Sequence, residues 1–138
     1  DNVLHNFTKP LNIIEKNISL LKTIAFSECR FVLYGFGTAG KNLLDIYLGR
    51  TQKTDRHDWV LSFIADKNRK PYLLDGESFL TKSPQDLKNS SFDYLIVSSD
   101  IYFSEIFDEL CGLGIDANKI KNRAFFLQIS SFWRQEKA

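Results

Sequence analysis

Three almost wholly apolar runs along the chain alternate with segments in which apolar residues recur at helical spacing. The runs are Phe31–Tyr34, Trp59–Ala65 and Phe92–Val97, and such runs are typical of strands buried on both faces of a sheet. Apolar residues three and four apart mark 42–48 and 103–113 as helices. Strands that alternate with helices predict an α/β fold, with a Rossmann-like parallel sheet flanked by helices.

A further amphipathic helix is predicted ahead of the first strand. Thr8 is suited to cap this helix, Pro10 fits its first turn, and an apolar stripe follows at helical spacing. The stripe comprises Leu11, Ile14, Ile18, Leu21 and Ala25. We expect this added amino-terminal helix to cover a side or an edge of the sheet; a helix that binds a partner is the alternative.

Glycine, proline and polar residues predict the remaining boundaries. Gly49 predicts the end of the helix that follows the first strand, and the polar stretch 50–58 then predicts a mobile surface loop. Ser78–Thr81 is compatible with a short third strand. Ser83–Asp86 has the cap, the early proline and the acid of a helix start. Gly114 predicts the end of the later helix.

The segment from Arg123 onwards is rich in large apolar side chains, namely Phe125, Phe126, Leu127, Ile129, Phe132 and Trp133. We expect this surface to pack on the domain itself or on another chain, which in the second case would form a homodimer. The pattern thus divides the chain into a helical extension (1–29), a Rossmann-like domain (30–121), for which the glycine turn described next predicts nucleotide binding, and an aromatic carboxy-terminal segment (122–138).

The turn after the first strand carries three glycines in the pattern G-x-G-x-x-G. Gly35 permits a sharp turn, Gly37 lets a diphosphate approach the backbone, and Gly40 lets the following helix pack close to the strand. The start of that helix presents unpaired N–H groups and the positive end of its dipole to an anion. The pattern favours nucleotide binding; a glycine turn kept only for helix packing is the alternative.

Polar residues at the ends of the other strands meet this turn at the same edge of a parallel sheet. Asp66 would accept hydrogen bonds from ribose hydroxyls and repel a 2′-phosphate, which favours NAD over NADP; an acid without a ligand is the alternative. Lys67, followed by Arg69 and Lys70, could receive a phosphate or remain solvated. For Ser99, capping of the next helix is favoured over cofactor contact. The candidate cofactor-binding residues are Gly35, Phe36, Gly37, Thr38, Ala39, Gly40, Asp66, Lys67, Ser98 and Ser99.

Composition narrows the classes of protein. The 138 residues suit one domain, 43% are apolar and the formal net charge is +1. No basic stripe argues for nucleic acid, no apolar run reaches the ~18 residues of a membrane span, and no signal peptide is visible. Cys29 and Cys111 lack metal spacing and are expected to be reduced packing residues, so we expect a cytoplasmic protein. Because the chain starts with Asp1 and has no Met, we expect it to be trimmed or part of a longer polypeptide.

Five short motifs follow one another in the chain: Gly35–Gly40, Phe63–Asp66, Leu80–Leu87, Asp93–Ser98 and Leu113–Ile120. In this order they resemble G-x-G-x-A-G, F-I-D-D, L-x-S-P-E-D-L, D-x-V-I-I-A and L-G-I-P-P-E-K-I. Those motifs belong to the amino-terminal domain of bacterial nucleoside-diphosphate-sugar epimerases and dehydratases, which act in polysaccharide biosynthesis. The sequence departs from the pattern at Ala65, where the family has a second acid.

The resemblance implies an NAD(P)-binding Rossmann domain of a bacterial sugar-nucleotide or polysaccharide biosynthesis protein. Two alternatives are a nucleotide-sugar-binding domain attached to a glycosyl-, acetyl- or methyltransferase, and a non-catalytic dimerisation scaffold. Catalytic residues are not identified, because none of the five tyrosines has the Lys four positions later that such enzymes use. S-adenosylmethionine is not expected either, since Leu33 stands where its enzymes usually carry an acid.

Overall fold

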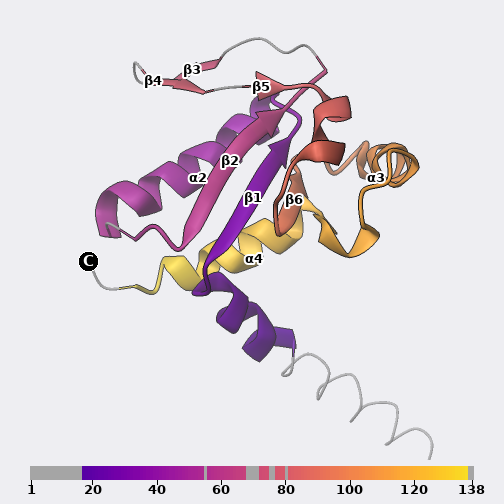
Figure 1. Ribbon diagram of the computed structural model, residues 1–138. Helices are drawn as coiled ribbons and strands as arrows, with labels where there is room; N and C mark the ends of the chain where they lie inside the picture. Colours follow the sequence, from indigo (N-terminus) through magenta and orange to yellow (C-terminus); the bar gives the residue numbers. More distant parts are fainter. Residues whose placement is uncertain (1–16, 55, 68–71, 75–76, 80, 137–138) are drawn as a thin grey trace, which may run out of the picture.

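The computed structural model describes residues 17–54, 56–67, 72–74, 77–79 and 81–136 (Figure 1). Its main sheet has five strands in the order β5-β2-β1-β6-β7, and all four pairs are parallel. The strands are β1 (Cys29–Tyr34), β2 (Trp59–Ala65), β5 (Thr81–Lys82), β6 (Tyr94–Val97) and β7 (Ile120–Lys121). The predicted α/β fold class is confirmed.

The segments between these strands contain α2 (Thr38–Thr54), η1 (Pro84–Asn89), α3 (Phe103–Gly112) and η2 (Ala117–Lys119), and α4 (Arg123–Trp133) follows the last strand. Residues 17–25 form a further helix. No helix in the described part of the chain is long and apolar enough to cross a membrane.

The expected third strand is divided between two sheets. Glu77–Phe79 (β4) pairs antiparallel with β3 (Tyr72–Leu74) in a separate hairpin, and the third parallel strand is β5. Leu80, which joins β4 to β5, lies outside the described residues. The helix start predicted at Ser83 becomes a 3₁₀ turn, in which the Asp86 carboxylate accepts from the Ser83 N–H group at 3.2 Å.

Side chains of the sheet alternate between two cores. Phe31 and Leu33 of β1 pack on the face covered by α2 and α4, whereas Val32 and Tyr34 pack on the face covered by η1 and α3 (Figure 1). All four residues are buried. This alternation on a strand covered on both faces explains why β1 reads as a continuous apolar run.

The alternation of side chains between the two faces is interrupted once in β2. Phe31 lies opposite Leu61, but Val32 lies opposite Phe63, so Ser62 is an extra residue in the register. Because one added residue turns the following side chains to the other face, both Leu61 and Ile64 pack against the core beside α2.

The helix after the glycine turn is longer than predicted. It continues through Gly49 to Thr54, so the prediction of a surface loop from residue 50 is wrong. The physical reason is Arg50, whose side chain is only 3% exposed. Its guanidinium donates to the Asp58 carboxylate at 2.6 Å and to the Glu136 carboxylate at 2.8 Å. These two ion pairs hold the end of α2 in place.

The carboxyl end of the helix 17–25 packs near β2 and α4. Trp133 of α4 is buried and donates its indole N–H to the carbonyl of Ala25 at 2.8 Å, and Trp59 donates to Ile24 at 3.0 Å. The aromatic segment therefore packs on its own domain. In the described part of the amino-terminal helix only the end next to β1 is buried: Ala25 is fully buried, whereas Ile18 is 49% exposed. The predicted residues 8–16 of that helix lie outside the described residues.

Candidate functional site

The order of strands places the candidate site beside β1. The chain runs from β1 outward through β2 to β5, then crosses to the other side of β1 for β6 and β7. The strand order therefore reverses between β1 and β6. In open α/β sheets, ligands bind beyond the carboxyl ends of the strands at such a reversal. Gly35 follows β1 at this point, and Ser98 follows β6.

The glycine turn is tightly built. Gly35 has φ +86°, a conformation that favours glycine, and its N–H donates to the carbonyl of Ala65 at 2.8 Å. A Cβ on Gly40 would lie 2.3 Å from the carbonyl oxygen of Gly35, so only glycine lets α2 start this close to the strand. A Cβ on Gly37, in contrast, would meet nothing within 4 Å. The backbone at Gly37 is therefore open to an incoming group.

Helix α2 begins directly after this opening. Its first helical hydrogen bond runs from the N–H of Lys41 to the carbonyl of Gly37 at 3.0 Å. An α-helix leaves the amides of its first turn without intrahelical partners, here those of Thr38, Ala39 and Gly40. Phe36 is partly buried and packs against the core. The arrangement can receive an anion.

Arg123, which the sequence analysis did not include, lies beside the first turn of α2. Its guanidinium lies 3.5 Å from the carbonyl oxygen of Ala39 and donates to the Asn42 side chain at 3.1 Å. It therefore adds a positive charge next to the helix start. Arg123 is more than 80 residues from the turn in sequence, so no local pattern could have revealed it.

Asp66 is placed next to the turn by the register of the sheet. Tyr34 lies opposite Ala65, so Gly35 and Asp66 leave adjacent strands side by side. The N–H of Asp66 donates to the carbonyl of Lys82 at 2.9 Å, which holds the strand end in position. The Asp66 side chain is half-buried. Its neighbour Lys67 is exposed, whereas Arg69 and Lys70 lie outside the described residues.

Ser98 and Ser99 make hydrogen bonds within the fold. The Ser98 hydroxyl is buried and lies 3.0 Å from the carbonyl oxygens of both Tyr34 and Gly35, so it braces the glycine turn. The Ser99 hydroxyl accepts from the N–H of Tyr102 at 3.2 Å, just ahead of α3. Contact of either serine with a cofactor stays a prediction.

A hollow of about 440 Å³ opens between the glycine turn and α3. Gly35 and Asp66 line it on the strand side, and Tyr102, Glu105, Ile106 and Glu109 line it on the α3 side. Its volume is within the ~300–1,000 Å³ of small-molecule sites. Three carboxylates face it with one cation, Lys67. This end of the site therefore suits a hydroxyl-bearing group better than a second phosphate.

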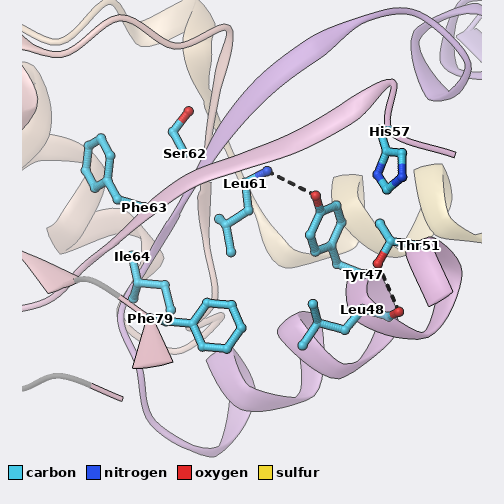
Figure 2. Close-up of a pocket in the computed structure, with 9 residues that line it drawn as sticks. All are labelled: Tyr47, Leu48, Thr51, His57, Leu61, Ser62, Phe63, Ile64 and Phe79. Carbon is cyan, nitrogen blue, oxygen red and sulfur yellow. Dashed lines mark hydrogen bonds between the residues drawn. The ribbon is translucent and has the colours of Figure 1, made fainter. Parts of the chain in front are cut away.

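A separate hollow of about 270 Å³ lies between α2 and β2 (Figure 2). Two of its polar groups are used inside the fold: the Tyr47 hydroxyl accepts from the N–H of Leu61 at 3.2 Å, and the Thr51 hydroxyl donates to the carbonyl of Leu48 at 3.1 Å. The first of these bonds satisfies the amide next to the extra residue Ser62. These side chains stabilise the irregular part of β2, so this hollow is not the candidate site.

Cys29 and Cys111 are free thiols. Burial, followed by the charges of Asp93 and Asp58, raises the pKa of Cys29 to about 12, so this thiol stays protonated and unreactive. Within the described ranges, no cluster of three or more His, Cys, Asp or Glu side chains could hold a metal ion.

Comparison with protein families is informative for the same region. Residues 27–121, more than half of the chain, match the family described as C2185-like, N-terminal. The chain belongs to this family. The matched region includes the whole glycine turn, Asp66 and Ser98. No curated protein matches the sequence.

This family corrects the resemblance inferred from the motifs. The matching family is not that of the nucleoside-diphosphate-sugar epimerases and dehydratases. The physical reason is that a glycine turn, a strand-end acid and a Ser-Pro helix start are local features that recur in many families of doubly wound sheets. Such short motifs report the fold, and they do not separate one family of that fold from another.

Proposed function

We propose that the domain binds a dinucleotide, NAD(H), at the carboxyl edge of its sheet. The observation that carries the proposal is the position of the glycine turn, at the strand-order reversal and with Gly37 open to solvent on its side-chain side. The diphosphate would lie over the first turn of α2. The nearby guanidinium of Arg123 supports this placement, because it adds positive charge where the phosphates would be.

The ribose next to the diphosphate would lie against Asp66. Two further carboxylates, those of Glu105 and Glu109, line the same hollow. Because these negative charges would repel a 2′-phosphate, we propose that NAD is preferred over NADP. A role in a sugar-nucleotide pathway has no support, because the chain belongs to a different family.

The chain offers no complete catalytic set to accompany the ligand. Sugar-nucleotide epimerases use a tyrosine with a lysine four positions later, and the sequence contains no such pair. Any oxidoreductase activity would therefore need residues from another segment or a partner chain. The dimerisation scaffold loses its main support, because Phe126, Ile129 and Trp133 are buried in the domain's own core.

Thermal unfolding with NAD, NADP, a uridine diphosphate sugar and S-adenosylmethionine tests the proposal. A ligand at a hundred times its dissociation constant should raise the free energy of unfolding by about 2.7 kcal/mol. We expect this shift with NAD, a smaller one with NADP, and a reduced difference between the two in Asp66→Asn. Stabilisation by the uridine diphosphate sugar alone would replace NAD by a nucleotide-sugar, and no shift with any ligand would contradict nucleotide binding.

A further inference from the structure

The hydroxyl of Tyr34 has no hydrogen-bond partner among the described residues, although it is buried. The residue ends β1, its side chain lies on the α3 face of the sheet, and only 4% of it is exposed. Buried polar groups in folded proteins nearly always have a partner, so an orphaned hydroxyl indicates that something is missing from the site. Burial, with the charges of Glu109 and Asp66 nearby, raises the pKa of Tyr34, so the hydroxyl keeps its proton to donate.

Two hollows meet above this tyrosine. The first is the hollow beside Gly35 and Asp66; the second, of about 450 Å³, lies farther along α3. Both are lined by Tyr34, Lys67 and Glu109. The Lys67 ammonium and the Glu109 carboxylate are 3.5 Å apart and more than half exposed, so their ion pair is a weak bridge between the two hollows.

The two hollows differ in chemistry. The first is lined by the carboxylates of Asp66, Glu105 and Glu109, which suit the hydroxyl groups of a ribose. The second is lined by Pro84, Leu110 and Leu113, with the amide of Gln85 at its edge. Apolar walls with a few polar groups at the rim suit a flat heteroaromatic ring that carries hydrogen-bonding atoms on its edge.

We propose that the second hollow holds the adenine base of the bound dinucleotide and that the Tyr34 hydroxyl donates a hydrogen bond to the base. This inference rests on the proposed function. The Lys67–Glu109 pair, which lines both hollows, would move aside when the ligand enters. Tyr34 is thus a ligand-binding residue that contacts the base, whereas the glycine turn binds the diphosphate.

Tyr34→Phe and Tyr47→Phe form a matched pair of variants for the test. Each removes one hydroxyl, but that of Tyr34 has no partner, whereas that of Tyr47 accepts from Leu61 on the opposite face of the sheet. Titration calorimetry should show that Tyr34→Phe weakens NAD binding by about fivefold, the worth of one hydrogen bond. Its unfolding midpoint should not fall. Tyr47→Phe should lower the midpoint and leave NAD affinity unchanged.

A second titration with ADP-ribose, which lacks nicotinamide, locates the contact. We expect Tyr34→Phe to weaken ADP-ribose and NAD by the same factor. Unchanged NAD affinity in Tyr34→Phe would overturn the inference and leave NAD binding itself intact. A lower affinity for NAD with an unchanged affinity for ADP-ribose would also overturn the inference, because Tyr34 would then contact the nicotinamide end of the ligand. A wild-type chain that binds no NAD would contradict the proposed function as well.

Discussion

Gly40 of α2 and the carbonyl oxygen of Gly35 lie so close together that a single methyl group does not fit between them. The added Cβ would be 2.3 Å from that oxygen, and both groups belong to backbone that cannot rotate away. The start of α2 is therefore fixed against the end of β1.

Gly40→Ala should consequently destabilise the protein. Overpacking of this kind costs about 1–3 kcal/mol, and here the helix start would have to move. Gly49→Ala is the control, because its Cβ meets nothing within 4 Å and lies in the same helix. The free energy of unfolding of Gly49→Ala should rise by up to ~1 kcal/mol, because alanine has a higher helix propensity than glycine. Urea unfolding measures both, and equal stability of the two variants would contradict the packing described here.

Gly37→Ala should separate folding from binding. Its Cβ meets no protein atom, so the unfolding midpoint should stay close to that of the wild type. The methyl group would occupy the space in which the diphosphate approaches the backbone, and NAD affinity should fall by about tenfold or more. Calorimetric titration checks this. Full affinity in a folded Gly37→Ala protein would show that no ligand approaches at this point.

The Arg50–Asp58 pair should make the free energy of unfolding decrease as the pH is lowered. Burial alone would raise the pKa of Asp58, but the hydrogen bond and charge of Arg50 hold it below its ordinary value of 3.8. A lowered folded pKa contributes stability above the unfolded value, and this contribution is lost as the pH falls through the folded value. Between about pH 6 and pH 2.5, the wild type should therefore lose more stability than Asp58→Asn.

The same variant has a cost at neutral pH. Asp58→Asn leaves the buried guanidinium of Arg50 with one carboxylate partner, Glu136, and should lower the free energy of unfolding by about 3 kcal/mol. Urea unfolding at several pH values gives both quantities. Parallel pH profiles for the two proteins would mean that Asp58 contributes nothing through its charge.

Cys29 and Cys111 should differ in reactivity. Cys29 is buried with its pKa raised to about 12, whereas Cys111 is half-buried on α3. Because the thiolate is the reactive form, a thiol reagent at about pH 8 should modify Cys111 and spare Cys29 in the folded protein. Native Cys111→Ser should thus react only after unfolding. Rapid reaction of that native variant would contradict the burial of Cys29.

Much of the fold follows from local pattern. Trp59–Ala65 is a strand with the predicted bounds, because its apolar run is closed by Asp58 and Asp66. The meeting of Gly35 and Asp66 also follows, since parallel strands end at a common edge. The end of α2 was predicted wrongly because the decisive contacts of Arg50 are with Asp58 and with Glu136, 86 residues away.

The site was foreseen only where backbone geometry determines it. Glycine spacing identifies a turn without knowledge of its neighbours, so Gly35, Gly37 and Gly40 are visible in the sequence. Arg123 and Tyr34 are not, because their roles depend on long-range packing: Arg123 reaches α2 from α4, and Tyr34 reads as one more apolar strand residue. The family, too, depends on the whole region 27–121 and not on its short motifs.

The pairing of Arg50 with Glu136 has a practical consequence for handling the protein. It fixes the last described residues near the start of β2, and the helix 17–25 enters β1 from that same edge (Figure 1). The glycine turn lies at the opposite edge. A surface-immobilised sample, tethered through an affinity tag at the carboxy-terminal end, would therefore present the edge with the proposed ligand site to the flowing buffer.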